Sequence, residues 1–209
     1  MDAVVKKLLH EAGETYAEEA GIPLKDQPAA LWKLLVLANL MSARISADIA
    51  MAAAHELFDA GGGTPRGMAK LSWQERVDAL GRGHYVRYDE STATRLGEMA
   101  ELVQDKYGGD LRRLPVTAER DIDRAAELLK EFKGIGPTGV DIFCREAQSV
   151  WPWLRPYFDG QTRKGAQRLG LPADPERLAG EVPDKELGRF AAALVRAARD
   201  KKLADSVKS

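Results

Sequence analysis

A glycine-punctuated segment, 133–139, has the composition of a tight turn between two helices. Its glycines permit left-handed backbone and leave main-chain amides uncovered. Pro137 suits the first turn of the following helix, where its missing N–H has no partner to lose. Amides at the positive end of that helix could bind a phosphate oxygen, and a lysine could add a charge beside it. The residues predicted to contact such an anion are Lys133, Gly134, Gly136, Thr138 and Gly139. A structural corner between helices would use the same glycines, so the segment alone leaves both interpretations open.

The second candidate for chemistry is Asp159, which follows the aromatic stretch 151–158. A carboxylate can in general stabilise a nearby positive charge or orient a water molecule. An aspartate followed by Gly-Gln-Thr is also a good helix N-cap, and the two roles can coexist. Arg163 and Lys164 come next in a stretch without acidic residues, which suits a polyanion. A solvated helix face would have the same composition.

The composition narrows the class of protein. The 209 residues include 31 Lys and Arg against 32 Asp and Glu, a formal charge of −1, so no strong overall field indicates a partner. A hydrophobic fraction of 44% is enough for a globular core. The single cysteine, Cys144, excludes an internal disulfide and a cysteine-ligated iron–sulfur cluster within one chain. The three histidines lack ligand spacing, so we expect no metal site.

The residues that form secondary structure predict an all-α chain, because Ala, Leu, Glu, Lys and Arg dominate and alternating Val/Ile/Thr stretches are scarce. We expect the segment 200–209 to fray. The longest apolar run, 31–41, is broken by Lys33 and Asn39 and is too short to span a bilayer. We therefore expect no membrane association. The single cysteine and an N-terminal segment without the apolar core of a secretory signal favour a cytoplasmic protein. The expected helices are 2–20, 29–41, 46–60, one starting at 72, 91–107, 117–132, one after Pro137, and 187–198.

The Gly-hydrophobic-Gly hairpin, together with the Trp/Pro-rich stretch and Asp159 behind it, resembles the helix-hairpin-helix/Gly-Pro-Asp superfamily of DNA glycosylases, typified by endonuclease III. The segment 37–44 resembles that family's Leu-Leu-Ser-Ala-Gln stretch, and 88–93 falls where its Tyr-Asn-x-Lys-Ala stretch lies. The resemblance covers about residues 29–198. It implies a two-lobed helical fold, with a six-helix lobe at 24–150 that carries the hairpin and a second lobe made of 1–23 and 151–209.

The resemblance also implies a function, DNA base-excision repair by cleavage of an N-glycosidic bond, with Asp159 as the catalytic carboxylate. Thr138 stands where bifunctional members have a lysine that forms a Schiff base, so the implied enzyme is a monofunctional glycosylase. Arg44 replaces a glutamine that often fills the gap left by a flipped base; it could wedge into the base stack, or be an ordinary salt-bridging arginine. Gly160-Gln161 replaces the family's usual Thr-His.

Two alternatives remain at this stage: a non-catalytic DNA-binding relative that keeps the hairpin, and a helical protein–protein adaptor. The implied partner is double-stranded DNA, bound by a monomer in the nucleoid. The resemblance implies a protein without an iron–sulfur cluster, as in the cluster-free branches of the family. It also allows a monovalent cation, because in relatives the hairpin carbonyls can hold one.

Overall fold

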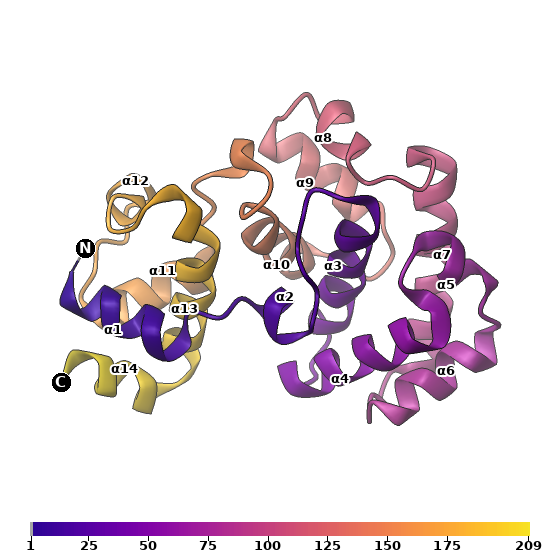
Figure 1. Ribbon diagram of the computed structural model, residues 1–209, viewed down its shortest axis with the longest axis horizontal. Helices are drawn as coiled ribbons and strands as arrows, with labels where there is room; N and C mark the ends of the chain where they lie inside the picture. Colours follow the sequence, from indigo (N-terminus) through magenta and orange to yellow (C-terminus); the bar gives the residue numbers. More distant parts are fainter. Residues whose placement is uncertain (1) are drawn as a thin grey trace. The chain divides into compact units, whose positions relative to one another are not determined.

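A computed structural model describes residues 2–209, and all regular secondary structure in that range is helical (Figure 1). This confirms the all-α prediction. None of the described helices combines the length and the apolarity that a membrane span requires. The chain divides into two compact units, which we describe separately: unit 1 comprises 1–18 and 144–209, and unit 2 comprises 19–143. The unit boundaries fall at 18/19 and 143/144. The boundaries expected from the sequence, 23/24 and 150/151, lie a few residues further along the chain.

Unit 2 is built around helix α3, Pro28–Met41, which is buried on nearly all sides. A helix that is apolar all round must be covered by others. Helix α3 packs against α4, α4 packs against α6, and α6 packs against α7 (Figure 1). The remaining helices complete this unit and lead to the hairpin. The bounds are α4 Ala47–Leu57, a π-helical turn Phe58–Gly62, α5 Pro65–Lys70, α6 Trp73–Arg82, α7 Asp89–Tyr107, α8 Arg113–Thr117, α9 Ile122–Lys130 and α10 Pro137–Ala147, whose last turn belongs to unit 1.

Unit 1 is organised by α13, Leu187–Arg199, which packs against α11, Gly160–Leu169, and against α1, Ala3–Ala12. The indigo α1 lies beside the yellow α13 and α14 (Figure 1). A Cβ added at Gly165 would lie 1.9 Å from the carbonyl oxygen of Leu194, so this glycine lets α11 approach α13 closely. The other elements are α2 Tyr16–Glu19, which runs one residue past the unit boundary, 3₁₀ turns Pro152–Leu154 and Asp184–Glu186, α12 Pro175–Ala179 and α14 Lys201–Lys208.

Two of the expected helices were wrong in extent, and the expected fraying of the C-terminal segment was also wrong. The expected helix 2–20 is two helices, because Thr15 and Glu18 form a capping box that starts a new helix. Thr15 N–H donates to Glu18 Oε2 (2.8 Å), and Glu18 N–H donates to Thr15 Oγ1 (3.1 Å). The expected helix 117–132 is broken by positive φ angles at Glu119 and Arg120. The tail expected to fray forms α14, because Asp200 caps it and its apolar face is buried.

Candidate nucleic-acid interface

The hairpin between α9 and α10 has the geometry that its glycines predict. Gly134 adopts a φ of +90°, a conformation that L side chains rarely occupy. Ile135, between the two glycines, is 4% exposed and anchors the turn in the core of unit 2. Val140 N–H donates to the Gly136 carbonyl (3.0 Å), and α10 begins at Pro137. The sequence thus forms a tight turn that leads directly into a helix N-terminus.

The outer edge of this hairpin is open. A Cβ added at Gly136 would meet no atom within 4 Å, and Pro137 and Thr138 are exposed. Backbone at this edge is therefore accessible to a ligand as bulky as a phosphate group. The helix that starts here is eleven residues long and directs the positive end of its dipole toward the same edge.

Gly139, another of the predicted contacts, lies in a different environment from Gly136. It is buried, and a Cβ there would lie 2.7 Å from Ser42 Oγ and 3.2 Å from Ile135. The absence of a side chain therefore lets α10 approach the end of α3. The structure assigns Gly139 to packing and not to an exposed anion-binding edge.

Lys133 lies on the hairpin with its side chain 69% exposed, and its Nζ lies 2.8 Å from Glu98 Oε1 on α7. At this exposure the ion pair is worth little, because water and salt screen it. A phosphate group could therefore take the place of Glu98 at small cost. The side chain can reach a ligand, but it shares its charge with an acidic neighbour.

Asn39 is a functional candidate that the sequence reasoning missed. Its side chain is buried in α3, and its Nδ2 donates to the carbonyl of Lys133 (3.0 Å) and approaches Met99 Sδ (3.1 Å). The same amide nitrogen would lie 2.6 Å from a Cβ at Gly134. Asn39 thus ties the turn to the central helix. A polar residue inside an otherwise apolar, buried run was the signal that could have indicated it.

The carbonyl oxygens of the hairpin are the groups that would bind the expected monovalent cation. The Phe132 oxygen accepts a hydrogen bond from Ile135 N–H (3.0 Å), and the Lys133 oxygen accepts one from Asn39. Both oxygens are the correct chemical type for such an ion, but both already have donors. Among the described residues, no group of three or more His, Cys, Asp or Glu side chains is arranged to hold a metal.

Asp159, in unit 1, is the N-cap of α11. Its Oδ1 accepts from Gln161 N–H (2.7 Å) and Thr162 N–H (2.9 Å), and its Oδ2 pairs with Nη1 of Arg145. The Asp159 side chain is 2% exposed and that of Arg145 is 4% exposed. The capping role that the sequence left open is therefore present. In this arrangement both carboxylate oxygens are occupied, and neither reaches solvent.

Arg145 belongs to a polar cluster within unit 1 that the sequence did not reveal. Its guanidinium carbon lies 5.9 Å from the centroid of the Tyr16 ring, which also lies 4.3 Å from the guanidinium of Arg196. Glu146, the next residue on α10, is fully buried and accepts a hydrogen bond from Ala17 N–H (2.9 Å). Burial raises the pKa of the Glu146 carboxyl, and the positive charge of Arg145 opposes that rise.

The segment before Asp159 is fixed by its own backbone contacts. Gln148 is buried and clamps Tyr157: its Oε1 accepts Tyr157 N–H and its Nε2 donates to the Tyr157 carbonyl, both at 3.0 Å. Arg155 donates to the carbonyls of Gln148 (2.7 Å) and Ser149 (2.9 Å). Arg155 therefore holds this loop in place. It is not a free basic side chain.

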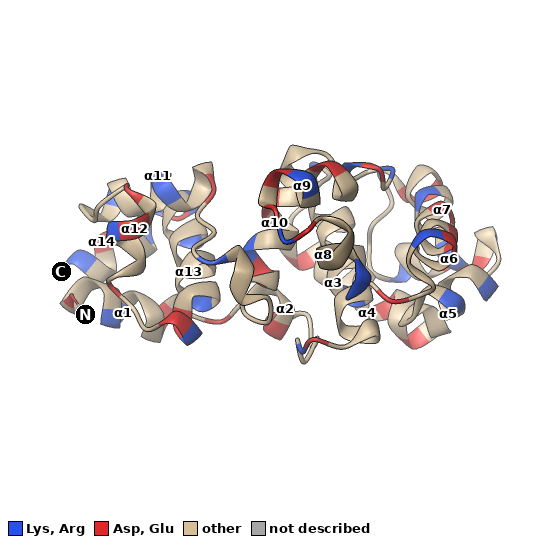
Figure 2. Ribbon diagram, turned by 90° about the horizontal axis from the view of Figure 1, so that it is seen from above, with Lys and Arg blue, Asp and Glu red and all other residues tan. Residues whose placement is uncertain are grey.

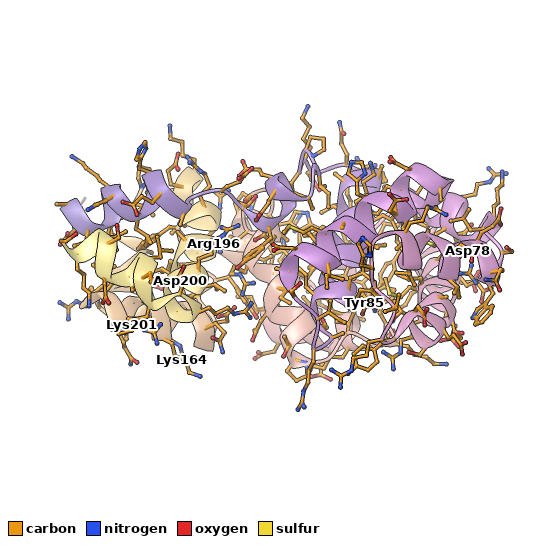
Figure 3. The ribbon with its side chains drawn as sticks, turned by 90° about the horizontal axis from the view of Figure 1, so that it is seen from below. Asp78, Tyr85, Lys164, Arg196, Asp200 and Lys201 are labelled. Carbon is orange, nitrogen blue, oxygen red and sulfur yellow. The ribbon has the colours of Figure 1, made fainter. Side chains whose placement is uncertain are left out.

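The remaining predicted contacts are exposed. Arg44 lies in the turn after α3, two residues beyond Ser42, and so on the same unit as the hairpin. Arg163 and Lys164 lie on the outer face of α11, whose basic residues are blue in Figure 2. Lys164 and Lys201 of α14 are labelled on unit 1 in Figure 3. The structure thus gathers the hairpin residues in unit 2, and Asp159, Arg163 and Lys164 in unit 1.

The helical architecture of this chain has counterparts among solved structures. The chain is similar to endonuclease III in a non-covalent DNA complex, with a TM-score of 0.56 and 16% identity over 92% of this chain and 81% of that one. It is also similar to endonuclease III in a trapped covalent DNA intermediate, described as an estranged-adenine complex, with a TM-score of 0.51 and 16% identity over 91% and 84% of the two chains.

At this identity the similarity establishes the fold, which is that of endonuclease III. The predicted fold class is thereby confirmed. No family model matches the sequence, and no curated protein matches it.

Proposed function

We propose that this protein binds duplex DNA through the 133–138 hairpin and acts as a DNA glycosylase of base-excision repair. The observation that carries the binding half is the open edge at Gly136, where a helix N-terminus and exposed backbone coincide. The support for the glycosylase half is the endonuclease III fold over nine-tenths of the chain. We further propose that it acts as a monomer, in the cytoplasm where the nucleoid lies.

The hairpin would recognise DNA by its backbone and not by its sequence. Amides at the start of α10 offer donors to one phosphate, and the helix dipole favours the negative charge. Lys133 would leave its ion pair with Glu98 and bind a second phosphate oxygen. Arg44, in the turn next to the contact between Ser42 and Gly139, would extend the same contact or support the base stack. Arg163 and Lys164 would add phosphate contacts from α11.

The proposed reaction is hydrolysis of an N-glycosidic bond. The oxygen of water bonds to C1′, the C1′–N bond breaks, and the base leaves with that electron pair and takes up a proton. Asp159 is the proposed carboxylate, because a negative charge stabilises the oxocarbenium-like sugar. Thr138 at the position of the family's lysine supports a monofunctional reaction, because a hydroxyl cannot form an imine.

A non-catalytic DNA-binding protein is the second candidate, and one observation favours it. One oxygen of Asp159 accepts hydrogen bonds from two backbone amides, the other is paired with Arg145, and the side chain is 2% exposed. A carboxylate held in this way is closed to solvent, so a sugar or a water can reach it only when its partners move. The binding half of the proposal is common to both candidates, so the two are separated by a measurement of base release.

The binding half is tested with Lys133→Glu and duplex DNA at several salt concentrations. Wild-type protein should bind with an affinity that falls steeply as salt rises, because phosphate contacts release counterions. Lys133→Glu should weaken binding by about tenfold and reduce the salt dependence by about one contact. Lys70→Glu, which reverses an exposed charge at the end of α5, is the matched control and should bind as wild type does. Equal affinities for the two variants would remove the hairpin from the interface.

The catalytic half is tested by base release from duplexes that carry uracil, 8-oxoguanine, 3-methyladenine, or adenine opposite 8-oxoguanine. If the protein is a glycosylase, Asp159→Asn should lose about two or more orders of magnitude in rate while duplex affinity persists. Asparagine keeps an oxygen that can cap α11. Undetectable release by the wild type over the whole panel, together with intact binding, would establish the second candidate.

A further inference from the structure

Asp159 is enclosed by a specific set of partners. Its Oδ1 caps α11, and its Oδ2 is bound by Arg145, a residue of α10 that is separated by fourteen positions in the chain. Both partners belong to unit 1. The capping bonds are compatible with a free second oxygen. Arg145 therefore occupies the second oxygen, which a water or a sugar would otherwise approach, and its positive charge balances that of the carboxylate.

Arg145 is held in place from its other side by the N-terminal part of the chain. The Tyr16 ring lies under its guanidinium, and Ala17 N–H is bound by the neighbouring Glu146. The segment before Tyr16 is fixed in turn, because Arg196 Nη1 donates to the carbonyl of Ala12 (3.2 Å) and Arg189 Nε donates to that of Gly13 (2.9 Å).

This arrangement is not an optimised ion pair. Arg145 Nε is buried and has no hydrogen-bond partner within the described part of the chain, and the same is true of Glu146 Oε1. Buried donors and acceptors without partners are costly. Arg145 thus keeps one donor unused while it occupies Asp159, and the contact cannot be explained as the arrangement that best satisfies these polar groups.

We propose that Arg145 is a positioning residue that holds Asp159 away from the sugar for most of the time, so that the wild type releases bases slowly and the rate rises when the contact is removed. The inference rests on the proposed function, since it assumes that DNA binds where the fold and hairpin suggest. A neutral buried pair contributes little stabilisation to a cationic sugar, whereas a capped but otherwise free carboxylate stabilises it fully. Arg145 therefore determines whether Asp159 can assist the attack of water on C1′.

The test compares base release by Arg145→Met and Arg145→Lys on the same panel of duplexes. Methionine matches the bulk of the arginine stem but has no charge, so base release should rise at least about tenfold over the wild type. Lysine keeps a cation beside Asp159, so the rate should stay near that of the wild type. The double variant Arg145→Met with Asp159→Asn should lose the gain. A residue with a merely structural role would not produce an Asp159-dependent increase.

Removal of one partner of a buried pair could unfold the protein, so Arg145→Gln is made as well; it keeps a donor for Asp159 without a charge, and an intermediate gain is expected. Thermal unfolding and duplex affinity are measured for each variant. A folded, DNA-binding variant without any gain would overturn the inference and leave the binding function intact. Failure of both neutral variants to fold would also overturn it, because Arg145 would then be a structural requirement. Loss of duplex binding by the wild type would instead refute the proposed function.

Discussion

Asn39 connects the hairpin to the most buried helix of unit 2 by a single donated hydrogen bond. We expect Asn39→Leu to fill the same volume but leave the Lys133 carbonyl without its donor, so that the turn loosens at Gly134. Duplex affinity should fall by about tenfold with a modest loss of stability, since a net hydrogen bond is worth about 1 kcal/mol. Affinity is measured by titration, and hairpin order by amide exchange.

Met99→Leu is the control for Asn39, because it removes the second contact of the amide and keeps the first. If Met99→Leu weakened DNA binding as much as Asn39→Leu does, the bond to Lys133 would not be the feature that matters.

Single residues also show what the sequence could and could not predict. The hairpin was predictable, because Gly134, Ile135 and Pro137 act through their own backbone and through neighbours a few positions away. Arg145 was not, because its significance comes from Asp159 and Tyr16, which are distant in sequence and on different elements. Asn39 lies between these cases: its burial was indicated by the pattern, but its partner was not.

The contact between α11 and α13 sets the position of the helix that Asp159 caps. A side chain at Gly165 would collide with the backbone of Leu194 at 1.9 Å, and backbone cannot move aside as a side-chain end can. Gly165→Ala should therefore push the two helices apart and cost about 2 kcal/mol in the free energy of unfolding. Gly160→Ala, on the same helix, meets no atom within 4 Å and should change stability by less than about 0.5 kcal/mol. Similar denaturation curves for the two variants would contradict this packing.

The ends of helices were harder to predict than their existence. Apolar periodicity located α3, α7 and α13 because long amphipathic or buried helices have a clear pattern. The break at 13–15 forms because the capping hydrogen bonds between Thr15 and Glu18 start a new helix there and the first helix does not continue. A Thr-x-x-Glu signature inside the apparent helix was the available signal. At the C-terminus, Asp200 and the buried Ala204 and Val207 stabilise α14, which composition alone classed as a fraying tail.

The boundary between the two units falls within α10, which begins at the hairpin and ends at Ala147, two residues after Arg145. One helix therefore carries the proposed phosphate contact at its first turn and the residue that occupies Asp159 near its last. A balanced net charge of −1 gives the protein no general attraction to DNA. The proposed binding would therefore come from local donors such as the hairpin amides. Neither charge nor composition indicates such a partner, whereas one short motif does.

The stability of the folded chain should carry a pH dependence that comes from Glu146. Burial raises its pKa in the folded state above the ordinary value of 4.5, so above that pH the folded chain binds more protons than the unfolded chain. The free energy of unfolding should therefore fall as pH rises above 4.5, the ordinary pKa of the carboxyl, and Glu146→Gln, which keeps an acceptor for Ala17 N–H, should remove that part of the slope. Denaturant unfolding across this range measures it. Glu14→Gln, at an exposed position of the same unit, should leave the slope unchanged. Parallel pH profiles for the wild type and Glu146→Gln would mean that Arg145 keeps Glu146 ionised in the folded protein, so that the cluster around Asp159 carries two buried carboxylates and not one.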